Sequence, residues 1–255
     1  MKTVKINNHE LKLYDSVDEM PIVNFQKYNK YVIIDSGLGS DVDSVDEHLV
    51  NLAKLIKQNK EKAQQELQNL RQTMHLIVSG ISPNYLAFAA LIHSIDGKEV
   101  TDLSDENLKL ILDKLKKIKH STIISLLLWV KKKLVTELET YFPNNFNDTR
   151  DKEVYDKIKQ RTILQLKSIA EGTDNADTIA EIDAYLFSLH KPKSFSGKSS
   201  IEIKYDKQFE TACMIISQKS NMNAKKMTVL EFYNTLNNLS KQAEAEAKAY
   251  KKVRR

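Results

Sequence analysis

The stretch that sets the fold class is residues 40–56, SDVDSVDEHLVNLAKLI. Ser40 suits the position just before a helix, because its hydroxyl can accept a hydrogen bond from a free amide of the first turn. Asp41 and Asp43 follow where negative charge is favourable, against the positive end of a helix. Apolar residues then recur three and four positions apart, at Val42, Val45, Leu49, Leu52 and Ile56. The pattern predicts an amphipathic helix with this stripe facing the core.

Similar signals fill most of the remaining chain. Helices are expected from about Glu61 to Gly80, from Ser82 to Ile92, from Ser104 to Ile118, from Ser121 to Tyr141, over Val154–Gly172, over Ile179–Leu189, around Phe209–Ile216 and from Thr228 onward. The first half of the 121–141 helix is apolar almost all round, which indicates either a core position or a subunit contact. The last helix runs into alternating Ala and Glu near residues 243–249, a segment that is either solvated or waiting for a partner.

Short strands are expected mainly at the N-terminus. Residues 4–13 alternate around Asn7-Asn8, as a hairpin does. The β-prone run Tyr31–Ile34 predicts another strand, and Ile201–Tyr205 predicts one that completes the sheet. The expected fold is mainly α and multi-helical, with a small N-terminal β-sheet. The expected division is a β-rich segment 1–40 packed on a helical domain 41–142, a helical hairpin 143–190, a linker and strand 191–205, and C-terminal helices 206–255.

Composition favours a soluble globular protein. The 255 residues are 41% hydrophobic and 29% charged, and only 6 Gly and 4 Pro interrupt the helices. The single Cys213 stands among Ala212, Met214 and Ile215 and is expected to be a buried hydrophobe. We predict neither a secretory signal at Met1–Val4 nor a segment long enough to cross a membrane.

Charge is distributed unevenly along the chain, although the net charge is only +5. The basic residues that we single out are Lys114, Lys116, Lys117, Lys119, Lys131, Lys132, Lys133, Lys251, Lys252, Arg254 and Arg255. The acidic ones are Asp35, Asp41, Asp43, Asp46 and Glu47. Such polarity would let copies of one chain meet head to tail, or let the basic residues contact nucleic acid without reading its sequence. Solvated helix faces are the plainest interpretation of each residue taken singly.

Catalytic patterns are weak. Residues 32–40, Val-Ile-Ile-Asp-Ser-Gly-Leu-Gly-Ser, resemble the first phosphate loop of the actin and sugar-kinase fold, but an acidic helix start follows the glycines and would repel phosphate. A tight turn at the glycines is the better interpretation. The acidic spacing at 41, 43 and 46 lacks the pattern of a calcium loop, and six scattered histidines show no zinc motif. We therefore predict no enzyme activity, no catalytic residue, no cofactor and no metal.

Several strings resemble a family of structural and assembly proteins from crAss-like and related tailed phages of Bacteroides. They are residues 21–30 (PIVNFQKYNK), 33–41 (IIDSGLGSD), 70–72 (LRQ), 80–83 (GISP), 86–89 (LAFA), 95–98 (IDGK), 195–197 (FSG), 205–210 (YDKQFE) and 228–233 (TVLEFY). The resemblance spans nearly the whole chain and carries no catalytic residues across.

The resemblance implies a virion protein assembled in the host cytoplasm, most simply a homo-oligomeric ring or connector at the portal and head-to-tail junction. Its partners would be copies of itself and other portal or tail proteins, with non-specific DNA contact as an option and no membrane. Two alternatives stay open. One is a tail-assembly chaperone or other morphogenesis factor outside the virion, and the other is a DNA-binding packaging or cargo protein.

Overall fold

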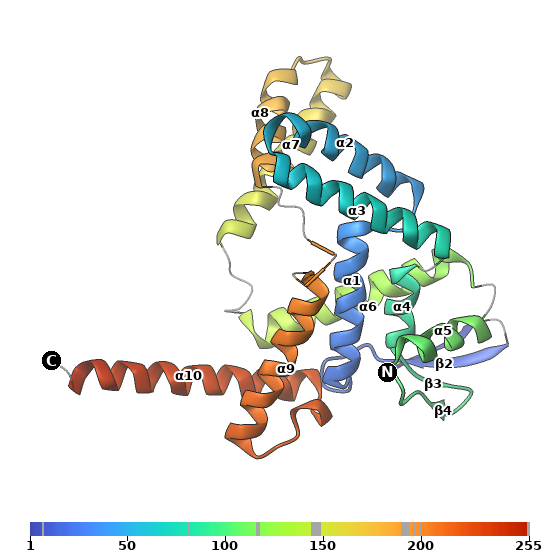
Figure 1. Cartoon of the computed structure of the whole chain (residues 1–255), viewed down its shortest axis with the longest axis vertical. Helices are drawn as coiled ribbons and strands as arrows, with labels where there is room; N and C mark the ends of the chain where they lie inside the picture. Colours follow the sequence, from blue (N-terminus) through green and yellow to red (C-terminus); the bar gives the residue numbers. More distant parts are fainter. Residues whose placement is uncertain are drawn as a thin grey trace. The chain divides into compact units, whose positions relative to one another are not determined.

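The computed structural model describes residues 1–253, except 7, 81, 116–117, 144–148, 190–193, 196 and 199. Its elements are β1 Lys2–Ile6, β2 His9–Leu13, α1 Ile22–Leu38, α2 Val42–Gln58, α3 Lys60–Ser79, α4 Pro83–Ala90, β3 Ile92–Ile95, β4 Lys98–Glu99, α5 Asp105–Lys114, α6 His120–Tyr141, α7 Thr149–Glu171, α8 Ala176–Leu189, α9 Ile201–Ser220, the 3₁₀ turn η2 Ala224–Lys226 and α10 Val229–Val253 (Figure 1). The predicted fold class, mainly α with a small and mostly N-terminal sheet, is confirmed.

The chain divides into two compact units. The first contains Met1–Glu137 and Lys193–Arg255, and the second contains Leu138–Pro192. In the second unit α7 and α8 pack together, with Ile182 buried and the Nε of Arg161 lying 2.6 Å from a carboxylate oxygen of Asp183. Among the described residues of both units, a search for a helix long and apolar enough to traverse a bilayer finds none.

The sheet is antiparallel, with strand order β1-β2-β3-β4. The predicted hairpin is confirmed: β1 pairs with β2, and Val4 lies opposite Leu11. The sheet is completed by β3 and β4, whereas Ile201–Tyr205, predicted as a strand, forms the first turns of α9. Ser200 caps that helix, since its hydroxyl accepts a hydrogen bond from the amide of Ile203, and this local bond favours helix at the start of the segment.

The predicted strand at Tyr31–Ile34 is also wrong, because these residues lie inside α1. Their β-branched run is only part of a longer pattern of buried side chains at three- and four-residue spacing, listed as Ile22, Phe25, Tyr28, Tyr31, Ile34 and Leu38. Burial of a whole helical face outweighs the β-propensity of a short run. The helix ends at Gly39, whose φ of 68° suits a glycine.

The core of the first unit is built around α1 and α4. Helix α4 buries Leu86 and every residue from Ala87 to Ala90, and the Asn24 side chain of α1 donates a hydrogen bond to the carbonyl of Ala90 at 3.0 Å. The N-terminal end of α1 joins the start of α10, because the Ile22 amide bonds to the Met227 carbonyl at 2.9 Å. Helix α1 thus packs against α3, α4, α9 and α10 of this unit (Figure 1).

Candidate interaction surfaces

The acidic residues singled out in the sequence gather around the start of α2. Asp35 lies in the last turn of α1, while Asp43, Asp46 and Glu47 are exposed on α2. Asp41, rather than Ser40, caps α2, since its carboxylate accepts a hydrogen bond from the Ser44 amide at 2.8 Å. The predicted capping position was therefore one residue early.

Helix α2 confirms the predicted helix but buries a different face. Its buried side chains are His48 and Leu55. By contrast, Val42, Leu49 and Ile56 of the predicted inward stripe are 69%, 47% and 64% exposed. The predicted inward stripe is thus correct only in part: Val45 and Leu52 are half-buried, whereas the other three leave apolar side chains on the exposed side of α2.

A buried polar cluster explains the rotation of α2. The His48 Nε2 donates to the carbonyl of Leu38, the last residue of α1, at 3.0 Å, and the Nδ1 of His48 lies 2.9 Å from a carboxylate oxygen of Glu66 on α3. The Thr73 hydroxyl donates to the same carbonyl at 2.7 Å. Buried polar groups need partners, so satisfying the end of α1 turns this face of α2 inward.

The same cluster sets the charge of His48. The hydrogen bond to Glu66 raises the pKa of His48, while burial lowers it and the bond to the Leu38 carbonyl raises it further. The net rise favours an imidazolium ion, which is also well placed beside the negative end of the α1 dipole.

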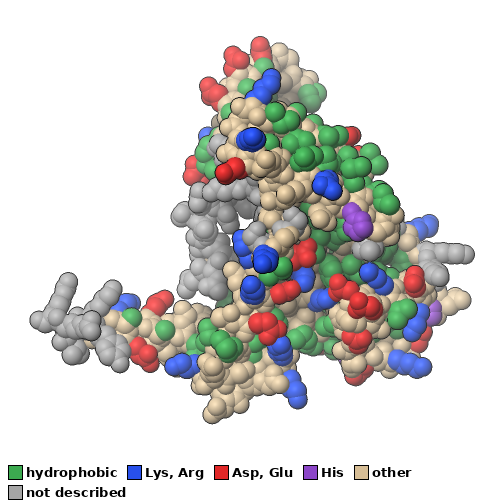
Figure 2. All heavy atoms as spheres, viewed as in Figure 1, with side chains coloured by type: hydrophobic (Ala, Val, Ile, Leu, Met, Phe, Trp, Pro, Cys, Tyr) green, Lys and Arg blue, Asp and Glu red, His purple; other side chains and the backbone are tan. Residues whose placement is uncertain are grey.

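Helix α3 adds apolar side chains to the exposed surface. Ala63 and Leu70 are buried, but Leu67, Met74 and Val78 are exposed. Figure 2 shows hydrophobic side chains gathered over α2 and α3 on the face toward the viewer. Exposed apolar groups clustered on one part of a surface are typical of contact sites.

The described basic residues that the sequence singled out lie on or next to three helices. Lys114 ends α5, Lys119 precedes α6, Lys131 and Lys132 are exposed on α6, and Lys251 and Lys252 belong to the last turn of α10. Lys116, Lys117, Arg254 and Arg255 lie outside the described residues. Lys114 also borders a pocket of 600 Å³ that is lined by β4, α5 and the ion pair between His9 and Asp96.

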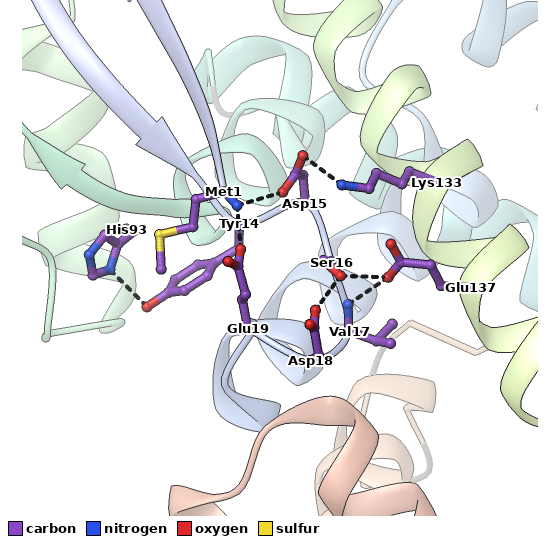
Figure 3. Close-up of polar contacts among 10 residues, drawn as sticks. All are labelled: Met1, Tyr14, Asp15, Ser16, Val17, Asp18, Glu19, His93, Lys133 and Glu137. Carbon is purple, nitrogen blue, oxygen red and sulfur yellow. Dashed lines mark hydrogen bonds and ion pairs between the residues drawn. The ribbon is translucent and has the colours of Figure 1, made fainter.

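Lys133 differs from its two neighbours because it is engaged inside the first unit (Figure 3). Its Nζ lies 3.0 Å from the buried carboxylate of Asp15, which also pairs with the amine of Met1 at 3.1 Å. One turn further along α6, Glu137 accepts hydrogen bonds from the Ser16 hydroxyl at 2.9 Å and the Val17 amide at 2.8 Å. These contacts fix α6 against the segment that precedes α1.

Burial raises the pKa of Asp15, but the hydrogen bonds from Lys133 and the N-terminal amine more than reverse this and lower it overall. Sequence reasoning missed this cluster. Its partners are 118 residues apart, so no local pattern could reveal it.

The exposed face of α6 combines lysines with apolar side chains. Ile123, Leu127, Val130 and Leu134 are buried, whereas Leu128 is 61% exposed and Val135 is 38% exposed. Lys131 and Lys132 lie between these two exposed residues. The sequence indicated either a core position or a subunit contact for this helix. In the structure one face of α6 belongs to the core, and a second face, both apolar and basic, is exposed.

A phosphate loop of the actin and sugar-kinase type requires a strand before its glycines, but residues 31–34 are helical. Asp35 instead lines a small pocket of 260 Å³ together with Ser40, Asp41 and Asn84. Within the described parts of the chain, no three His, Cys, Asp or Glu side chains converge as metal ligands would. Cys213 is buried, as predicted, and burial raises the pKa of its thiol.

Comparison with protein-family models, with curated proteins and with solved structures finds no match for this chain.

Proposed function

We propose that this chain is a non-enzymatic structural protein of a phage virion, a homo-oligomeric ring or connector at the portal and head-to-tail junction. The family resemblance of the sequence suggests this place in the particle. The observation that carries the self-association is the pair of exposed apolar helix faces, one on α2 beside acidic residues and one on α6 beside lysines.

The C-terminal helix supports the same function. The described side chains from Ser240 to Ala249 are all exposed, although they belong to a helix that begins with a capping box and buried residues. An isolated helix end in water gains little from its own hydrogen bonds, so a partner that covers it would stabilise it.

The experiment is quantitative mass spectrometry of purified virions, followed by a cryo-EM map of the head-to-tail junction. The expected result is a fixed number of copies per particle, arranged as a ring. Absence from purified virions, with the chain present in infected-cell lysate, would overturn the connector and favour a tail-assembly chaperone.

DNA binding is a second candidate, favoured only by the exposed Lys131 and Lys132 on one helix face. Phosphate contacts would make duplex binding fall steeply with salt. Leu128, exposed between these lysines and the start of α6, contributes nothing to such contacts, which is why we place the connector first.

A further inference from the structure

We infer that the exposed face of α2 in one copy docks on the exposed face of α6 in the next copy, with Asp46 of α2 opposite lysines of α6. This inference rests on the self-association in the proposed function and names the two surfaces that carry it.

The exposed face of α2 has the spacing of a helix that pairs with another helix. Val42, Leu49 and Ile56 are seven residues apart, and all three are among the exposed large hydrophobic side chains. A seven-residue apolar repeat keeps one stripe facing a partner helix along its length. Asp46 is exposed one turn after Val42 and three residues before Leu49, so it places a negative charge on this stripe, whereas Glu47 lies on a different side of the helix.

The exposed face of α6 repeats this design with the opposite charge. Leu128 and Val135 are seven residues apart and exposed. Lys131 and Lys132 fall one turn after the first and one turn before the second, so they share the face with them. Apolar stripes supply association energy, and the opposed charges select this pairing over α2 on α2 or α6 on α6.

The two faces lie near opposite ends of α1. His48 joins α2 to Leu38, the last residue of α1, whereas Lys133 and Glu137 join α6 to the segment that precedes α1. A helix of 17 residues is about 25 Å long, so the two surfaces are well separated. A contact between different surfaces at separate places on each copy is head-to-tail, and it generates a ring when the rotation between copies closes and an open filament when it does not.

A second copy fits these surfaces better than DNA does. A phosphate backbone would satisfy Lys131 and Lys132 but would leave Leu128 and Val135 against charged groups and water. The α2 surface carries acidic residues that repel DNA, and it would have no role in that case. The α6 surface fits a partner helix whose face is both acidic and apolar. The exposed face of α2 in a second copy of this chain has both properties.

The test is a charge-reversal experiment on the full chain, read by sedimentation velocity. The acidic-face variant carries Asp46→Lys, and the basic-face variant carries Lys131→Glu and Lys132→Glu. Each variant alone opposes like charges at the contact, and we expect self-association to weaken about tenfold or more. Mixing the two variants restores opposite charges at both kinds of contact, so the mixture is expected to associate like the wild type.

Matched controls separate this contact from general charge effects. Lys204→Glu with Lys207→Glu makes the same charge change on exposed residues of α9 and should leave association unchanged. Thermal unfolding should be the same for all variants, because every substituted residue is exposed.

The outcomes distinguish this inference from the proposed function. Association that survives both charge reversals, or a mixture that fails to recover, overturns the α2–α6 contact while leaving the connector in place. A wild-type chain that stays at its monomer mass of 29.3 kDa overturns both, as does a monomer whose duplex DNA binding is lost with Lys131→Glu and Lys132→Glu.

Discussion

At the residue scale, His48 couples protonation to folding. Its imidazole is buried between the Glu66 carboxylate and the carbonyl at the end of α1, and the bond to Glu66 raises its pKa above 6.5. A raised pKa in the folded state means that folding is favoured while the group is protonated. The contribution is complete below the ordinary pKa and is lost as the pH rises through the raised value.

We therefore predict that the wild type loses stability as the pH rises above about 6.5, the ordinary histidine value, measured as the free energy of unfolding in urea. His48→Gln should remove this part of the pH dependence and should destabilise the chain by about 3 kcal/mol below that pH, because Glu66 is left buried without its partner. His75→Gln, on the exposed side of α3, is the control and should behave like the wild type. An unchanged pH profile in His48→Gln would contradict the assignment.

Lys131, Lys132 and Lys133 are neighbours in the sequence with different roles. We predict that Lys133→Ala destabilises the chain by about 1–3 kcal/mol, because the buried carboxylate of Asp15 loses one of its two cationic partners. Lys132→Ala should change stability by less than about 0.5 kcal/mol, since its side chain is exposed. Equal effects of the two substitutions in urea unfolding would show that the Asp15 contact contributes nothing.

At the element scale, the rotational position of α2 can be tested with two adjacent residues. Leu55 is 2% exposed and Ile56 is 64% exposed. We predict that Leu55→Ala costs about 2–4 kcal/mol because it leaves a cavity, whereas Ile56→Ala costs less than about 0.5 kcal/mol. The reverse order would mean that the stripe predicted from the sequence is the buried one after all.

The start of α10 is a second test at this scale. The helix predicted from Thr228 onward begins with a capping box: the Thr228 amide donates to the Glu231 carboxylate at 2.9 Å, and the Glu231 amide donates to the Thr228 hydroxyl at 3.3 Å. We predict that Thr228→Ala lowers the free energy of unfolding by about 1 kcal/mol. Thr211→Ala, within the exposed side of α9, should be neutral or slightly stabilising because alanine is the better helix former.

At the scale of the whole molecule, the separation of acidic and basic residues is expected to make self-association depend on salt concentration. If acidic α2 meets basic α6, raising the NaCl concentration from about 0.05 M to about 0.5 M should weaken association several-fold, since salt screens exposed charges. Sedimentation velocity across this range measures the effect. Association that strengthens steadily with salt would instead point to a contact held by apolar side chains alone.

Much of the fold was predictable because helices and hairpins are encoded locally. The hairpin around residue 7, the helix stop at Gly80, the cap at Ser104 and the capping box at Thr228 all depend on residues a few positions apart. The strands predicted at 31–34 and 201–205 failed because each short β-prone run belongs to a longer helical pattern. The third and fourth strands were missed because the helix predicted from Ser82 to Ile92 runs into β3, whereas α4 ends at Ala90 and β3 begins at Ile92.

The candidate surfaces were predictable only in part. The sequence by itself determined that α2 is an amphipathic helix and that acidic and basic residues are separated along the chain. Only the tertiary structure decided which side of α2 is buried, and that Lys133 binds Asp15 while Lys131 and Lys132 face solvent. The physical reason is that periodicity fixes the spacing of a helical stripe, whereas the buried side is chosen by distant polar groups, such as Glu66 and the end of α1, that need partners away from water.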